Sequence, residues 1–167
     1  MKYLFLLRHA KSSWSNAGLA DRDRPLNQRG LRDAPRMGQW LAEYSLRPGQ
    51  IVSSSAVRAL TTAETMAQLL GFQSTDVVTD ARIYEATPQR LLTVIQELDD
   101  QRDRIMLVGH NPGLTELVNI LDGVRIDNVP TCGLAILKLQ VEHWAEVNMA
   151  DAELVIFQYP KNLYPPK

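Results

Sequence analysis

The chain has 167 residues, of which 45% are hydrophobic and 22% are charged, and its formal net charge at pH 7 is -1. This length and composition are typical of a globular protein, so we predict a single domain over residues 1–167. A net charge close to zero gives no general attraction to nucleic acid or to an anionic membrane surface, and we expect neither as a partner.

The composition also argues against a disulfide, a metal and a secretory signal. Cys132 is the only cysteine, which excludes an intrachain disulfide and a cysteine metal cluster. The histidines lie far apart without ligand spacing, so we expect no metal and no other cofactor. The apolar run near the start is too short for a signal-peptide core, and no segment reaches the length of a membrane-spanning helix. We therefore expect a cytoplasmic protein.

The first predicted element is a buried strand over Tyr3–Leu7, an unbroken apolar run that stops at Arg8 and His9. In an open α/β sheet, ligands bind beyond the carboxyl ends of the strands, which would place Arg8 and His9 at a binding site. The alternative is that both are ordinary polar residues at the end of a strand. Hydroxyl residues that could line a pocket for an anion follow them: Ser12, Ser13 and Ser15.

A polar loop over Ser12–Pro25 precedes a predicted helix. Asn27 is a fitting N-cap, and apolar residues follow it at helical spacing: Leu31, Ala34, Met37, Leu41 and Tyr44. Pro35 falls inside this pattern, where it either kinks the helix or marks the first turn of its main segment.

The next strand and helix carry an arginine placed against the helix dipole. A short strand is predicted over Gln50–Ser53, and Ser54-Ser55 offers an N-cap for a helix over about 56–70 that ends at Gly71. Arg58 lies in the first turn of this helix, where a cation is disfavoured unless it shares an anion with the helix. A solvated arginine is the alternative. The predicted apolar face consists of Leu60, Ala63, Ala67 and Leu70.

The second half of the chain continues the alternation of strands and helices. A buried strand over 104–109 ends in a second histidine, His110. Thr87-Pro88 predicts a helix start, and Gly123 stops a helix that begins near Leu114. Together the pattern predicts an α/β fold, a three-layer α/β/α sandwich with a mostly parallel central sheet. The other predicted segments are strands over 76–79, 133–141, 144–147 and 154–157 and an extended tail over 163–166.

Two strands that each end in a histidine suggest a shared site. If these strands are parallel neighbours, Arg8, His9, Arg58 and His110 converge at one edge of the sheet. Two arginines can hold a phosphate with bidentate hydrogen bonds. One histidine can then attack phosphorus while the other donates to the developing charge. The pattern therefore favours phosphoryl chemistry without a metal.

Three motifs carry a family resemblance. The segment Leu7-Arg8-His9-Ala10 resembles the Arg-His-Gly/Ala signature of the histidine phosphatase superfamily, whose fold is phosphoglycerate mutase-like. Residues 53–64, with their serine run followed by Arg-Ala and Thr-Ala, resemble its second motif, and residues 108–113 its third. The motifs follow the family order between Met1 and about Leu121. Chain length and the Arg-His-Ala-Lys-Ser and Gly-His-Asn-Pro-Gly forms are most similar to the small SixA-like phosphohistidine phosphatases.

The resemblance implies roles for the four central residues. His9 would be the nucleophile that becomes phosphorylated. Arg8 and Arg58 would bind the phosphoryl oxygens, and His110 would complete the catalytic pocket. Ala10 stands where glycine is commoner in the family, which is a small change.

The resemblance also implies three further site residues. Glu85 stands where many members have an acidic catalytic residue, and the Asn111 amide would be a further phosphate donor. Ser15 occupies the place of an asparagine that contacts phosphate in mutase-like members, so that contact is in question. Only 24 residues, Ala86 to Gly109, separate Glu85 from His110, whereas larger mutases and sugar phosphatases carry a longer insertion there.

The implied enzyme is a metal-independent phosphatase that acts on a phosphorylated protein, with phosphohistidine as the favoured substrate. One alternative is a phosphatase or mutase for a small phosphate ester, which would need a covered and more basic pocket. A second is a non-catalytic phosphate-binding protein, which retention of Arg8, His9, Arg58 and His110 disfavours. We expect a monomer.

Other noticeable residues have ordinary explanations. We expect structural roles for His143 and Cys132 and packing roles for Trp14 and Trp40. Arg24 belongs to an Arg-Pro-Leu segment that resembles a recurrent family loop, and it would tie that loop to the sheet.

Overall fold

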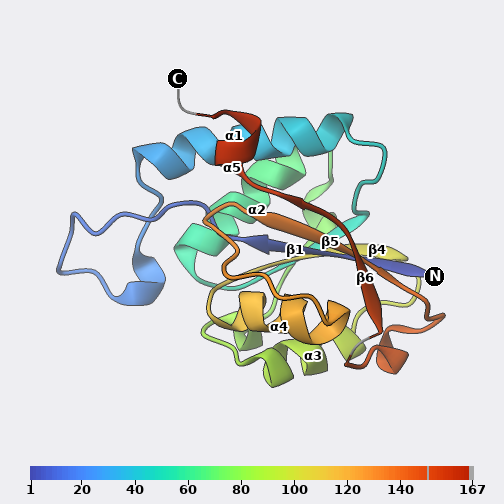
Figure 1. Cartoon of the computed structure of the whole chain (residues 1–167). Helices are drawn as coiled ribbons and strands as arrows, with labels where there is room; N and C mark the ends of the chain where they lie inside the picture. Colours follow the sequence, from blue (N-terminus) through green and yellow to red (C-terminus); the bar gives the residue numbers. More distant parts are fainter. Residues whose placement is uncertain (150, 166–167) are drawn as a thin grey trace.

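The centre of the molecule is a six-stranded sheet with the strand order β3-β2-β4-β1-β5-β6. It is seen edge-on between two layers of helices in the computed structural model, which describes residues 1–149 and 151–165 (Figure 1). The strands are β1 (Lys2–Arg8), β2 (Gln50–Ser53), β3 (Val77–Thr79), β4 (Arg104–Gly109), β5 (Leu134–Leu139) and β6 (Ala152–Gln158).

The sheet is mostly parallel. Strands β1, β2, β3 and β4 run in one direction, while β5 pairs antiparallel with both β1 and β6. Arg8 pairs with Gly109 in the register of β1 with β4, so the next residue of each strand leaves the sheet at the same level. The predicted fold class is confirmed, and its key consequence is that His9 and His110 follow neighbouring strand ends.

Helices cover both faces of the sheet. The helices are α1 (Gln28–Glu43), α2 (Val57–Leu69), α3 (Pro88–Gln96), α4 (Gly113–Asp122) and the short α5 (Pro160–Leu163). Figure 1 shows α1, α2 and α5 on one face and α3 and α4 on the other. None of the helices in the described ranges is both long enough and apolar enough to span a membrane.

The continuous apolar run of β1 is explained by burial on both faces. Leu4 and Leu6 pack in the core under α3 and α4, whereas Phe5 and Leu7 pack in the core under α1 and α2. All four are almost completely buried. Burial of one such side chain stabilises the fold by roughly 1.5–3 kcal/mol, so a central strand of this kind is held firmly.

The predicted helix ends at four places are confirmed. The Asn27 side chain accepts a hydrogen bond from the Gly30 N–H, and Thr87 caps α3 by accepting from the Arg90 N–H. Gly71 and Gly123 both have φ of 73°, the left-handed conformation that ends a helix at low cost for glycine.

Three details of the first two helices differ from the predictions. Leu31 is 58% exposed, because α1 instead presents Gly30 to the chain after β1: a Cβ there would lie 2.2 Å from the Lys11 carbonyl oxygen. Pro35 lies in the middle of α1, which continues unbroken through it, and not in the first turn of the helix. The N-cap of α2 is Ala56 and not a serine. The Ser54 hydroxyl accepts from the Ala56 N–H and bonds to His110.

Two predictions for the end of the chain are wrong. Residues 144–147 were predicted as a strand, but Trp144–Glu146 form a 3-10 turn. The Trp144 indole is fully buried and donates to the Arg102 carbonyl. This side chain is therefore buried by packing in the core and not by strand pairing. The extended tail predicted over 163–166 is wrong at its first residue, because Leu163 is the last residue of α5. Tyr164 and Pro165 lie in neither a helix nor a strand, and residue 166 lies outside the described residues.

Candidate active site

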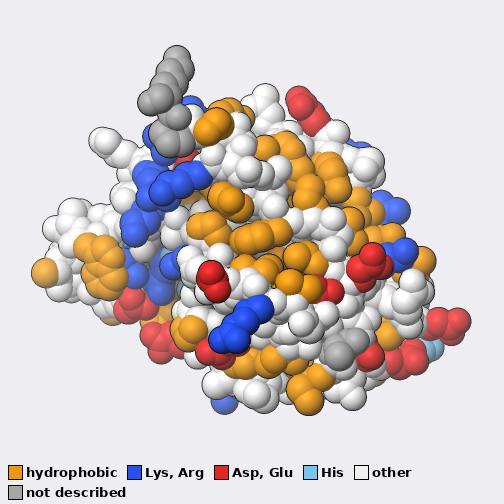
Figure 2. Space-filling model, viewed as in Figure 1, with side chains coloured by type: hydrophobic (Ala, Val, Ile, Leu, Met, Phe, Trp, Pro, Cys, Tyr) orange, Lys and Arg blue, Asp and Glu red, His pale blue; other side chains and the backbone are white. Residues whose placement is uncertain are grey.

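His9 and His110 meet where β1 and β4 end. Their ring centroids are 5.1 Å apart, and the His9 N–H donates to the Gly109 carbonyl at 3.1 Å. This end of the sheet faces the loop of residues 12–26 (Figure 1). Figure 2 shows Lys and Arg side chains gathered on this side of the molecule. The net charge of the chain therefore conceals a locally basic surface that favours an anionic substrate.

The hydrogen bonds of His9 define its reactive nitrogen. Nδ1 lies 2.7 Å from the Ala10 carbonyl oxygen, which can only accept, so Nδ1 carries the proton and Nε2 carries the lone pair. The residue is 7% exposed. Burial, and then the charges of Arg58 and Arg8, lower the pKa of His9 from 6.5 to about 4. His9 is thus a neutral imidazole at pH 7, with Nε2 available as a nucleophile.

The backbone after His9 is tied to the helix that carries Arg58. The Ala10 N–H donates to the Thr62 hydroxyl oxygen at 3.0 Å. The same hydroxyl donates to the Arg58 carbonyl at 2.7 Å, one turn earlier in α2. Thr62 is completely buried, so this link is shielded from water and fixes His9 and Arg58 relative to each other.

Arg58 is buried and Arg8 is half-buried, and a backbone carbonyl anchors each of these two predicted phosphate-binding arginines. Arg8 donates from Nη1 to the Val129 oxygen at 3.0 Å, and Arg58 donates from Nη1 to the Asp21 oxygen at 2.7 Å. Within the described residues, Nε of each arginine is buried without a hydrogen-bond partner. A buried donor without an acceptor is costly, so each Nε–H is suited to an incoming phosphoryl oxygen.

His110 is oriented by a serine that follows β2. Its Nε2 shares a hydrogen bond of 2.7 Å with the Ser54 hydroxyl, and the edge of the Tyr84 ring lies against it with centroids 5.5 Å apart. Nδ1 is buried and finds no partner in the part of the chain that the structure describes. Burial and the neighbouring His9 lower the pKa of His110 to about 3. Ser54 was part of a recognised motif, but its partner could not be read from the sequence.

A carboxylate that the sequence did not single out lies in the site. Asp21, in the 3-10 turn Asp21–Asp23, accepts at Oδ2 from Arg58 at 2.9 Å and from the Tyr84 hydroxyl, and at Oδ1 from Arg24 at 3.1 Å. The Tyr84 hydroxyl and then Arg58 hold the pKa of Asp21 well below its usual range. Burial, and next this hydrogen bond, raise the pKa of Tyr84 to about 12.

Ser15 and Asn111 do not direct their side chains at the two histidines. Ser15 is exposed on the loop, where its hydroxyl bonds to the Ser13 hydroxyl at 2.8 Å. The Asn111 amide donates to the Val129 oxygen at 2.9 Å, and its own oxygen accepts from Thr115. Because Arg8 uses the same Val129 oxygen, the Asn111 side chain supports the anchor of Arg8.

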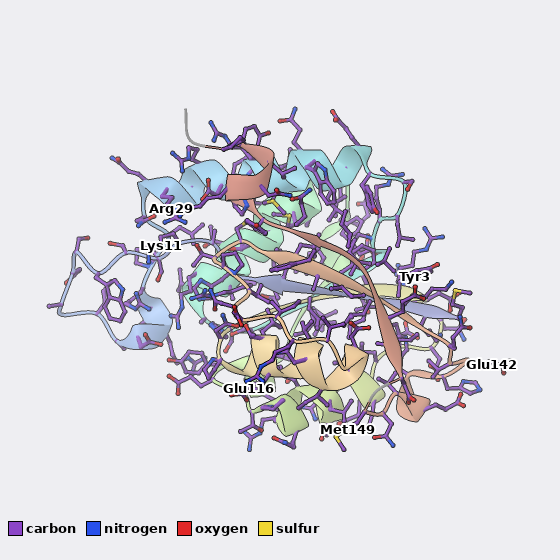
Figure 3. All side chains as sticks on the ribbon, in the orientation of Figure 1. Tyr3, Lys11, Arg29, Glu116, Glu142 and Met149 are labelled. Carbon is purple, nitrogen blue, oxygen red and sulfur yellow. The ribbon has the colours of Figure 1, made fainter. Side chains whose placement is uncertain are left out.

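Glu85 lies beside His110 at the rim of a hollow of about 370 Å³. The residue is exposed and has a φ of 52°, in the left-handed region that side chains rarely adopt. A second carboxylate, that of Glu116 on α4, also lines the hollow. Figure 3 labels its position. The rest of the lining is mostly small or apolar: Ala86, Thr87, Pro88, Asn111, Pro112 and Gly113.

The minor residues have mixed outcomes. Arg24 ties the loop down as predicted, donating to the Ser12 hydroxyl at 2.9 Å. Trp40 packs against Tyr44 with ring centroids 4.7 Å apart. The packing role predicted for Trp14 is wrong, because its ring is 72% exposed and serves mainly as a surface for the Arg24 guanidinium. Cys132 is buried, and its backbone N–H donates to the His9 carbonyl at 3.0 Å. His143 lies against Asp100, with Nδ1 3.3 Å from the carboxylate.

Residues 4–88 match the family model of the Histidine phosphatase superfamily (branch 1). The chain belongs to this superfamily and is a phosphatase, and metal independence fits the family. An uncharacterized chloroplastic protein of Arabidopsis thaliana is 35% identical to it, over 86% of this chain and 69% of that protein.

Two solved structures show the same fold. A candidate phosphohistidine phosphatase SixA from Agrobacterium tumefaciens is 28% identical and superimposes with a TM-score of 0.81, over 95% of this chain and 98% of that chain. The protein histidine phosphatase SixA complexed with tungstate is 20% identical, with a TM-score of 0.81 over 96% and 99% of the two chains.

Proposed function

We propose that the chain, as one domain over residues 1–167, is a protein phosphohistidine phosphatase that works through a phosphoryl group carried on His9. The observation that carries this proposal is the state of His9. Its Nδ1 proton is donated to the Ala10 carbonyl, which leaves the Nε2 lone pair free. The charges of Arg58 and Arg8 act on this ring, and the Nε–H of each arginine has no partner among the described residues. A nucleophile and an anion clamp at one place are the requirements of covalent phosphoryl transfer.

The proposed reaction has two displacements. In the first, the Nε2 lone pair of His9 forms a bond to phosphorus while the bond from phosphorus to the leaving nitrogen or oxygen breaks with its electron pair. In the second, water forms the new bond to phosphorus and gives its proton to the carboxylate that protonated the leaving group in the first step. The bond to Nε2 breaks with its electrons returning to the imidazole. Arg8 and Arg58 stabilise the charge on the phosphoryl oxygens in both steps.

The hollow beside His110 supports a protein side chain as the leaving group. It lies next to the reacting centre, is lined by small residues and carries Glu85 and Glu116 as its charged groups. Two carboxylates disfavour anionic metabolites, whereas they tolerate a neutral or protonated imidazole. Imidazole also leaves more easily than an alkoxide, so a carboxylate on the rim, such as Glu85, suffices as a proton source.

Support for the substrate also comes from relatives. The two solved structures named for phosphohistidine or protein histidine phosphatases match nearly the whole chain. The small-ester alternative would need extra cations around the hollow, and its lining contains none. A non-catalytic phosphate-binding protein would not need the defined tautomer of His9.

Trapping the intermediate tests the proposal. The protein is mixed with a histidine-phosphorylated protein, denatured in alkali, digested and mapped by mass spectrometry, with His9→Ala as the control. We expect phosphate on His9 alone, attached at Nε2 by NMR of the isolated peptide, and loss of turnover in the variant. A fully active His9→Ala enzyme, or a higher kcat/KM on small phosphate esters than on phosphohistidine, would contradict the mechanism or the substrate, respectively.

A further inference from the structure

We propose that Asp21 is a positioning residue that holds the guanidinium of Arg58 so that its Nε–H edge meets the phosphoryl group. This inference rests on the proposed function for the identity of the phosphoryl group. Its structural basis is independent, because it concerns how the loop of residues 12–26 holds one arginine.

Two oxygen atoms of Asp21 accept hydrogen bonds from the two terminal nitrogens of the Arg58 guanidinium. The backbone oxygen takes Nη1 at 2.7 Å, and Oδ2 of the carboxylate takes Nη2 at 2.9 Å. A guanidinium is planar, so two fixed nitrogens define the orientation of the whole group. The Nε–H edge, including the second Nη2 proton, is left for another acceptor.

Arg8 shows the same arrangement with a different anchor. Its Nη1 is also held by a backbone oxygen, that of Val129, and its Nε is also buried without a partner among residues 1–149 and 151–165. Two arginines that are anchored at Nη1 and unpaired at Nε are consistent with one anion that both would share. Asp21 therefore does for Arg58 what Val129, supported by Asn111, does for Arg8.

Asp21 is itself held rigidly enough to act as an anchor. The Tyr84 hydroxyl and the Arg24 Nε donate to its carboxylate. Arg24 is buried and bonds to Ser12 and Ser13, which follow His9 by three and four residues. A continuous series of hydrogen bonds thus runs from the end of β1 through Arg24 and Asp21 to Arg58.

A carboxylate near an anion site has two opposite effects. Its charge repels the anion, whereas its hydrogen bonds remove the cost of ordering the arginine when the anion binds. Replacing Asp21 by Asn therefore distinguishes the two roles by the sign of the change. Positioning predicts that the variant binds oxyanions more weakly, and competition for Arg58 predicts that it binds them more tightly.

The test uses tungstate as the probe, measured by calorimetry on the full chain. We expect Asp21→Asn to weaken tungstate binding by about 10-fold or more, as expected when an anion-binding group loses its orientation. Asp23→Asn is the matched control, because Asp23 lies in the same turn, is exposed and bonds to no side chain within the described residues. It should bind tungstate within about 2-fold of wild type.

A double-variant cycle shows whether Asp21 acts through Arg58. The kcat/KM for an aryl phosphate is measured for wild type, Asp21→Asn, Arg58→Ala and the double variant, with folding checked by circular dichroism. We expect Asp21→Asn to cost about 10-fold or more, through both kcat and KM, when Arg58 is present and less than about 2-fold when it is absent. Tighter or unchanged tungstate binding, or additive losses in the cycle, would overturn the proposal. Because tungstate binding requires no turnover, it decides the role of Asp21 even if no phosphate is trapped on His9.

Discussion

Lowering the pH should destabilise this protein through the histidines of its active site. His9 and His110 are buried beside arginines, which lowers their pKa values to about 4 and about 3. In the unfolded chain both would titrate near the ordinary value of about 6.5. Below that pH the unfolded state binds more protons than the folded state. The contribution of the two neutral histidines to the free energy of unfolding is therefore fully present above pH 6.5 and declines as the pH falls towards 4.

The size of the effect follows from the shift. For His9 alone, the pKa is about 6.5 in the unfolded chain and about 4 in the folded protein. Lowering the pH from 7.5 to 5 therefore reduces the free energy of unfolding by roughly 2 kcal/mol. The effect of His110 does not simply add, because the charge of each ring disfavours protonation of the other. A loss of about 2 kcal/mol is a large part of the stability of a domain of this size.

Urea unfolding at pH 7.5 and pH 5 measures the loss, and His9→Gln removes the titrating group while keeping a polar side chain of similar length. We expect the stability of the variant to change by about 2 kcal/mol less than that of wild type between the two pH values. The free wild-type enzyme should also keep its kcat/KM down to about pH 5, since His9 stays neutral there. Equal pH sensitivity of the two proteins, or NMR titration of the His9 ring near pH 6.5, would refute this account of the site.

Three further predictions concern catalysis. Arg58→Lys keeps the charge but loses the Nε–H and both Nη contacts to Asp21, so kcat/KM should fall on the order of 100-fold. An unchanged kcat/KM would show that the planar guanidinium is not needed. Glu85→Gln should reduce the kcat/KM for an alkyl phosphate by about 100-fold and the kcat/KM for phosphohistidine far less. Glu142→Gln, at the other end of the molecule, is the control (Figure 3), and equal losses on the two substrates would favour the small-ester enzyme. Excess chelator should leave the rate unchanged, and a loss that added magnesium or zinc reverses would contradict a site built on arginines.

The parts of the site that follow strands could be predicted from the sequence. A buried parallel strand has a recognisable apolar run, and its next residues must lie at the edge of the sheet. His9, Arg8 and His110 therefore came together as expected, with Arg8 paired to Gly109 in the register. Arg58 was predicted as well, because a cation in the first turn of a helix needs a physical reason.

Asp21 and Tyr84 could not be predicted in the same way. Asp21 lies in a polar loop whose composition gives no periodicity, and its partners Arg58 and Tyr84 are 37 and 63 residues away. Spacing along the chain could not decide whether Ser15 contacts phosphate, and in the structure this residue is exposed on the loop. Leu31 shows the same limit for packing, since the close approach of Gly30 to Lys11 sets which face of α1 is buried.

The central position of β1 governs the order in which the catalytic pocket can be assembled during synthesis. This strand is made before β4 and β5, yet these two strands are its neighbours in the sheet, with Tyr3 opposite Arg104 and Lys2 opposite Leu139. Until those segments emerge, both edges of an apolar strand stay unpaired, which exposes the nascent chain to aggregation. Such distant pairing also slows folding. His9, the proposed nucleophile, is therefore translated well before the two strands that complete its surroundings.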